Sequence, residues 1–251
     1  MSARELSQVL AGSTILVVIW EAAAVATDAT GLIPHLTQIV VAGWHLFQED
    51  QLHMDISWTL ARAMSSFAAA LFIGVPAGVL LGRVPILTRM FEGWLHFFRS
   101  IPAFILLPFF LAVLHGGEAA RLATVTFGCS VVIAGYTALG VRNVSELRIR
   151  VAKLYKAGPW HIWFRVIFMD ALPQTLDGVR MGLSLALILA LVAEIMLGAT
   201  FGLGTRVNDS LAGFDLPKMY ALIIVIGVVG YILNLLAAFV TQRVAPFAGE
   251  A

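Results

Sequence analysis

The residues with the clearest chemical potential lie in two places, a basic loop at residues 141–173 and the acidic residue Glu194. The loop sets arginine, lysine and tryptophan side chains between two long apolar runs, so it is too charged for hydrocarbon and suited to contact another macromolecule. Glu194 lies within an apolar run, where a carboxylate must face a partner helix, the interior of a bundle or water. These features predict a contact surface and an interior polar site.

The sequence lacks the motifs of nucleotide binding, nucleophilic catalysis and metal binding. It contains no G-x-x-x-x-G-K-[ST] loop for a nucleotide, no G-x-S-x-G or H-E-x-x-H motif, and no carboxylates at metal-ligand spacing. Its single cysteine, Cys129, cannot form an intramolecular disulfide, and its histidines are scattered. We therefore expect no catalytic residue, no metal site and no cofactor in this chain, so any nucleotide must be bound by a separate subunit.

The composition is that of an integral membrane protein, with 60% hydrophobic residues, 12% charged residues and a mean hydropathy of +0.91. The formal net charge of +1 gives no reason to expect a nucleic-acid partner. Apolar runs of spanning length predict about six helices in an all-α polytopic membrane bundle. The runs are residues 9–27, 57–81, 90–114, 121–141, 174–199 and 217–240.

Lysine and arginine are concentrated at one set of helix ends, which should face the cytoplasm. That set contains Arg4, Arg83, Arg89, Arg142, Arg148, Arg150, Lys153, Lys156, Arg165 and Arg243, whereas the opposite set holds mainly Arg121, Arg206 and Lys218. Both termini and the basic loop are therefore predicted to be cytoplasmic. The chain divides into a retained N-terminal helix (1–30), a periplasmic segment without lysine or arginine (31–56), and a core (57–251).

Several spans have unusual interiors. Pro76 lies in the second span, and Pro102 and Pro108 lie in the third, where they should kink or break the helix. Small residues recur along the fifth span, from Gly178 to Gly198, a pattern that favours close helix packing.

Several motifs resemble those of one family of transport proteins. The basic loop from Ala152 to Pro173 is followed by G-V-R-M-G and A-E-I-M-L-G-A-T-F-G-L-G. Upstream stand S-W-T-L-A-R-A-M-S-S-F, G-V-P-A-G-V-L-L-G and F-F-R-S-I-P-A-F-I-L-L-P-F-F. From about Pro34 to the C-terminus, the chain resembles the permease subunit of ABC importers, in the nitrate, sulfonate and taurine branch of the binding-protein-dependent transport family.

The resemblance implies a type I importer permease (MetI-like) fold in a bacterial inner membrane. It implies that two permease subunits form the pore, that a cytoplasmic ATPase dimer binds ATP and Mg²⁺, and that a periplasmic or lipid-anchored protein delivers the solute. The basic loop corresponds to the family's EAA loop, whose short helix docks on the ATPase. The residues expected to form that docking helix are Ala152, Lys153, Leu154, Tyr155, Lys156, Ala157, Gly158, Pro159 and Trp160.

The residues of the loop favour docking independently, because basic side chains alternate with apolar anchors such as Leu154 and Trp160. The alternative is a basic amphipathic helix that lies on anionic lipid. Candidate residues of the translocation path are Ser100, Pro102, Tyr136, Thr137, Ser184 and Glu194.

The loop departs from the family pattern at Arg150, Val151 and Lys156. Lys156 stands where the family has a glycine, and lysine does not enter positive φ freely. We therefore expect a reshaped loop, with Gly158 held extended by Pro159. A weakened coupling loop would be tolerated best in a heterodimer, which is our hypothesis for the pore.

The family branch suggests a small organic or inorganic anion, such as a sulfonate, nitrate or taurine, as the solute. The alternative function is a secondary transporter or channel that runs on an ion gradient, with Glu194 as the ion or proton site. An intramembrane enzyme lacks the required constellation of residues.

Overall fold

The computed structural model describes residues 3–27 and 31–244, and every regular element among them is helical. The all-α bundle predicted from hydropathy is therefore confirmed. The elements are α1 (Ala3–Ala26), α2 (Leu36–Gln48), α3 (Asp50–Arg83), α4 (Pro85–Ser100), η2 (Ala103–Leu106), α5 (Leu107–Leu114), α6 (Gly117–Arg142), α7 (Glu146–Leu154), α8 (Pro159–His161), η3 (Ile162–Ile167), α9 (Phe168–Leu197), α10 (Leu203–Ala212) and α11 (Leu216–Val244).

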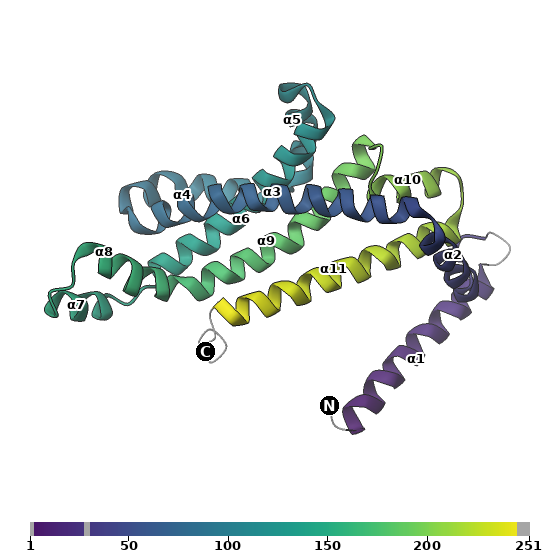
Figure 1. The fold of residues 1–251 in the computed structure, drawn as a ribbon, viewed down its shortest axis with the longest axis horizontal. Helices are drawn as coiled ribbons and strands as arrows, with labels where there is room; N and C mark the ends of the chain where they lie inside the picture. The colour runs from purple at the N-terminus through teal and green to yellow at the C-terminus, as the bar shows by residue number, and fades with distance from the viewer. Residues whose placement is uncertain (1–2, 28–30, 245–251) are drawn as a thin grey trace.

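Four long helices, α3, α6, α9 and α11, run roughly side by side along the longest axis of the molecule (Figure 1). Helices α7 and α8 lie at one end of this bundle, and α2 and α10 lie at the other. Because the basic loop contains α7 and α8, we call their end the inner end and the opposite one the outer end. Helix α1 joins the bundle at the outer end, beside α2.

The long helices account for most of the predicted spans. Residues 51–83, 117–142, 159–197 and 216–243 form helices that are long and apolar enough to cross a membrane. The N-terminal apolar helix, Leu10–Ala26, is shorter than these spans. Its role as a retained anchor stays a prediction, and the two termini lie outside the described residues.

The third predicted span is broken, as its prolines suggested. Helix α4 and the segment Ala103–Leu114 meet at an angle of 93°. Pro102, which has no backbone N–H, lies in the break between them. Helix α5 consequently projects sideways from the bundle (Figure 1).

Glycines bring α3 unusually close to α6. A Cβ added at Gly78 would lie 2.6 Å from the carbonyl oxygen of Ala134, and one at Gly82 would lie 2.8 Å from that of Ala138. Only glycine permits this close approach of the two backbones. Close van der Waals contact matters here because the hydrophobic effect does not hold helices together inside a lipid bilayer. The small residues of α9 have a similar effect, because Gly178 packs against Tyr136 of α6.

The segment predicted as a periplasmic loop, residues 31–56, is largely helical. It contains α2 and the first turns of α3, so α3 begins seven residues before the expected span. Ile39 and Leu46 of α2 are buried against Leu222 of α11. This amphipathic packing explains why α2 is ordered although it is too short to span a membrane.

Candidate functional site

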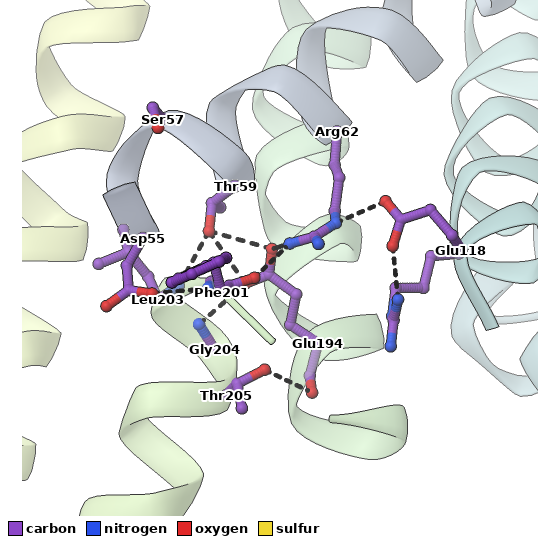
Figure 2. Close-up of polar contacts among 12 residues, drawn as sticks. Asp55, Ser57, Thr59, Arg62, Glu118, Glu194, Phe201, Leu203, Gly204 and Thr205 are labelled. Carbon is purple, nitrogen blue, oxygen red and sulfur yellow. Dashed lines mark hydrogen bonds and ion pairs between the residues drawn. The ribbon is translucent and has the colours of Figure 1, made fainter. Parts of the chain in front are cut away.

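A chain of buried and partly buried polar contacts, which we call the outer network, joins the helices at the outer end. Figure 2 shows its centre, where side chains of α3, α6 and α9 converge on the start of α10. The outer network comprises Asp55, Thr59, Arg62, Glu118, Arg121, Glu194 and Arg206.

The outer network provides hydrogen-bond acceptors for the backbone N–H groups at the start of α10. The N–H of Gly202 donates to Asp55 Oδ1 (2.9 Å), and the N–H of Leu203 donates to Thr59 Oγ1 (2.9 Å). The N–H of Gly204 donates to Glu194 Oε2 (2.9 Å). The first N–H groups of a helix have no partner within the helix, so these three side-chain acceptors allow α10 to begin in a buried place.

The two glycines of F-G-L-G lie in close contact with the end of α9. Gly202 has φ +152°, and a Cβ there would lie 2.6 Å from the Glu194 carboxyl carbon. A Cβ at Gly204 would lie 2.4 Å from the carbonyl oxygen of Leu191. Glycine is needed at both positions, at Gly202 because of the Glu194 carboxylate and at Gly204 because of the backbone of α9.

Arg62 is the central cation of the outer network. Its Nη1 donates to Glu194 Oε1 (2.8 Å) and to the carbonyl of Phe201 (2.7 Å), and its Nε donates to Glu118 Oε1 (2.7 Å). Glu194 has 0% of its surface exposed, and it also accepts from Thr59 Oγ1 at 3.0 Å. The buried negative charge is therefore paired and hydrogen-bonded, as burial requires.

The network continues on both sides of Arg62. Arg121 of α6 pairs with Glu118 at 2.6 Å and also donates to the carbonyl of Gly198. Arg206 of α10 pairs with Asp55 at 3.1 Å and with Glu49. Arginine and carboxylate side chains thus tie α3, α6, α9 and α10 together at one end.

Sequence reasoning found Glu194 but missed its partners. Asp55 lies just before the predicted span 57–81, and Thr59 and Arg62 lie within it, so hydropathy gives no sign that their side chains meet Glu194 and the start of α10. A signal was present, because spacings of four and three residues place these polar side chains on one face of a helix.

The structure does not bring the predicted path residues together. Thr137 is buried against Gly78 of α3, Tyr136 packs on Gly178, and Ser184 Oγ donates to Asn234 Oδ1 of α11 at 2.7 Å. These three lie in contacts between helices. Ser100 and Pro102 are exposed at the break in the third span. A role in the path stays a prediction for all six residues.

The predicted docking segment, residues 152–160, forms parts of two helices rather than one. Helix α7 covers Glu146–Leu154, and α8 begins at Pro159 and leads into α9. Proline at the first position of α8 favours a new helix start there. The expected single docking helix is therefore replaced by a helix, a turn and a second helix.

Lys156 adopts the conformation that was expected to require glycine. Its φ is +56°, its N–H donates to the carbonyl of Lys153 (2.9 Å), and the N–H of Ala157 donates to that of Ala152 (3.1 Å). This is the Schellman helix ending, with lysine at the left-handed position. The prediction that Lys156 reshapes the turn is wrong, because the closing hydrogen bonds compensate for its strain. Gly158 is extended, as predicted, with φ −66° and ψ 161°.

Helix α7 has apolar residues on two opposite faces. Ile149 and Ala152 pack inward on a cluster around Ile162 and Ile167, and Arg148 forms an ion pair with Asp170 of α9. The outward face carries three exposed apolar residues, which we call the docking stripe. They are Leu147 (70% exposed), Val151 and Leu154 (83% exposed).

The structure is a polytopic membrane bundle with an exposed apolar stripe on α7 at its inner end and a polar network at its outer end. Residues 60–246 match the family model "Binding-protein-dependent transport system inner membrane component", so the chain belongs to that family. It is the permease subunit of an ABC importer, a multi-pass inner-membrane component rather than an enzyme, as predicted.

Individual relatives agree with the family. The chain is 30% identical to a probable ABC transporter permease protein of Brucella melitensis, covering 86% of this chain and 88% of the relative. It is 26% identical to the taurine transport system permease protein TauC of Escherichia coli, with 95% and 88% covered. It is 25% identical to the nitrate import permease protein NrtB of Synechocystis, with 78% and 70% covered.

A solved structure shows the same fold. The chain matches a structure of the MetNI methionine ABC transporter in an inward-facing conformation with a TM-score of 0.67 and 22% identity. The match covers 77% of this chain and 96% of the other. The MetI-like fold expected from the motifs is thereby confirmed.

Proposed function

We propose that this permease forms part of the translocation path for a small anion. We propose further that a cytoplasmic ATPase binds α7 and drives transport. The observation that carries the coupling is the docking stripe. Leu154 and Leu147 are exposed on a helix whose opposite face packs against the bundle. Exposed apolar anchors flanked by basic residues are typical of a protein interface.

The fold supplies a route by which movement of α7 reaches the outer end. Helix α7 is joined to the first turn of α9 by the ion pair between Arg148 and Asp170. Helix α9 has 30 residues and is therefore about 45 Å long. It ends with Glu194 inside the outer network, so a displacement at the loop is carried along one helix to α10.

The partners and the solute follow from the family and the relatives. We propose that an ATPase dimer binds ATP and Mg²⁺, that a second permease completes the pore, and that a periplasmic or lipid-anchored protein delivers the solute. The relatives named for taurine, nitrate and bicarbonate transport support a small anion as the class of solute.

The geometry of Glu194 does not favour the alternative of an ion-driven transporter. Its two carboxylate oxygens are occupied by donors from Thr59, Arg62 and Gly204, and the side chain is fully buried. A proton or ion site has to exchange with water. We propose that Glu194 acts instead as an outer lock.

The test is binding of the partner ATPase by Leu154→Asp. Burying a leucine side chain contributes about 1.5–3 kcal/mol, so the variant should bind the ATPase about 10- to 150-fold more weakly in a titration. Ser145→Asp introduces the same charge at the N-cap of α7, where aspartate is favoured, and should bind as the wild type does. Undiminished binding and solute-stimulated ATP hydrolysis by Leu154→Asp would refute the docking role of the stripe.

The second permease is either an unlike subunit, as we hypothesised, or another copy of this chain. The intact turn at Lys156 removes one reason to expect a weakened loop, which leaves only Arg150 and Val151 as departures. Expression of this permease with its ATPase, but without any second permease gene, tests the hypothesis. An intact complex with ATP-driven uptake would exclude the heterodimer.

A further inference from the structure

An unpaired arginine lies beside the break in the third span. Arg99 is the penultimate residue of α4, and its side chain is exposed. Within residues 3–27 and 31–244 its guanidinium forms no ion pair or hydrogen bond. It differs in this from Arg62 and Arg121 of the outer network, which are paired with carboxylates.

Arg99 reaches a depth that lies within the membrane. Its Nη1 would be 3.3 Å from a Cβ added at Gly135, so the guanidinium lies against α6 where a glycine leaves room for it. At a rise of 1.5 Å per residue, Gly135 is about 27 Å along α6 from Gly117 and about 10 Å from Arg142. An arginine facing lipid inside a membrane costs about 3 kcal/mol. This face of the bundle should therefore line water.

A pocket opens next to Arg99. Its volume is about 300 Å³, and it is lined by Ile101 and Pro102 of the break, by Phe127 and Val131 of α6, and by Arg99 itself. Because one water molecule occupies about 30 Å³ in the liquid, the pocket has room for a small solute with part of its hydration shell. No acidic side chain lines it, so the charge of Arg99 is not neutralised there.

We propose that Arg99 and the pocket at the broken span form an anion-binding site within the translocation path, for the oxyanion group of a solute such as a sulfonate, nitrate or bicarbonate. The guanidinium presents parallel N–H donors that match two oxygens of such a group. The inference rests on the proposed function and adds that the path itself selects for charge.

The experiment compares Arg99→Gln, Arg99→Lys and Arg180→Gln in the complete transporter reconstituted in liposomes. ATP-driven uptake of labelled taurine, nitrate and bicarbonate is measured below saturation. Loss of one charge-assisted hydrogen-bond pair should lower uptake by Arg99→Gln about 10- to 100-fold, and Arg99→Lys should recover part of it. Arg180 is a matched control, because it is exposed on α9 but lies about 140° around the helix from Leu185, which lines the pocket.

A second measurement separates the site from the proposed function. The same three anions should raise the unfolding temperature of the wild-type complex in detergent, and Arg99→Gln should abolish this rise. Normal uptake by Arg99→Gln would overturn the site and leave the proposed function standing. A shift that depends on Arg99 without ATP-driven uptake would support the site and count against the proposed function. The absence of both uptake and shift in the wild type would overturn both.

Discussion

Arg62→Met provides the sharpest test of the outer network. The substitution removes the donors that Glu194 and the carbonyl of Phe201 receive from the guanidinium, while the apolar stem is kept. Glu194 is fully buried, so its charge is left with only Thr59 and the N–H of Gly204 as donors. Removing one partner of a buried ion pair typically costs about 3–5 kcal/mol.

The expected cost converts into a large thermal shift. For a chain of this size, 1 kcal/mol changes the unfolding temperature by about 2–4 °C, so Arg62→Met should unfold about 6–20 °C below the wild type. Tryptophan fluorescence of the purified permease in detergent, recorded at one fixed heating rate, measures the difference even if unfolding is irreversible. The double variant Arg62→Met/Glu194→Gln should lose less than the sum of the two single variants, because no unpaired charge remains.

The control is an ion pair of similar geometry at the inner end. Arg142 and Glu92 are 2.6 Å apart, but both side chains are substantially exposed. Such pairs contribute about 0–1 kcal/mol, so Arg142→Gln should shift the unfolding temperature by no more than about 4 °C. A shift for Arg62→Met as small as this, or strict additivity in the double variant, would show that the network does not lock the outer end.

Two further substitutions test the turn of the basic loop and the glycine contact. Lys156→Gly should raise the unfolding temperature by a few degrees, because glycine relieves about 1 kcal/mol of backbone strain at φ +56°. An equal rise for Lys156→Ala would contradict that reason, because alanine keeps the Cβ that causes the strain. Gly78→Ala should lower it and reduce the yield of folded permease, because the Cβ would lie 2.6 Å from the Ala134 carbonyl. Gly227→Ala in α11, where a Cβ meets nothing within 4 Å, should be neutral or stabilising, and matched losses in the two variants would refute the packing argument.

The spans and the polar loop could be predicted from the sequence because each depends on local composition. Runs of apolar residues place α3, α6, α9 and α11, and prolines locate the break at Pro102. The helices of residues 31–56 could not be placed in this way. Helix α2 has few polar residues and is ordered by contacts with α11, which is almost 180 residues distant along the chain.

The members of the outer network could not be predicted from hydropathy for a different reason. Arg62, Glu118 and Arg206 lie on three helices, and nothing in their separate surroundings shows that they converge. Arg99 could not be predicted as a site residue, because the depth of its side chain in the bundle depends on its contact with Gly135 of α6. Lys156 shows the opposite case. Lysine disfavours positive φ, but the hydrogen bonds that close the end of α7 outweigh this preference.

Helix α9 connects the basic loop, the pocket beside Arg99 and the outer network. It pairs with the loop through Asp170, lines the Arg99 pocket with Leu185 and ends at Glu194 in the outer network. Its ion pairs lie near its two ends, whereas the buried face of its middle includes the small residues Ala186 and Ala190. Small residues give a smooth surface on which packed helices shift by small amounts. If the ATPase binds α7 as proposed, a displacement of α7 should shift α9 along α6, change the width of the pocket beside Arg99 and alter the contacts of the outer network together.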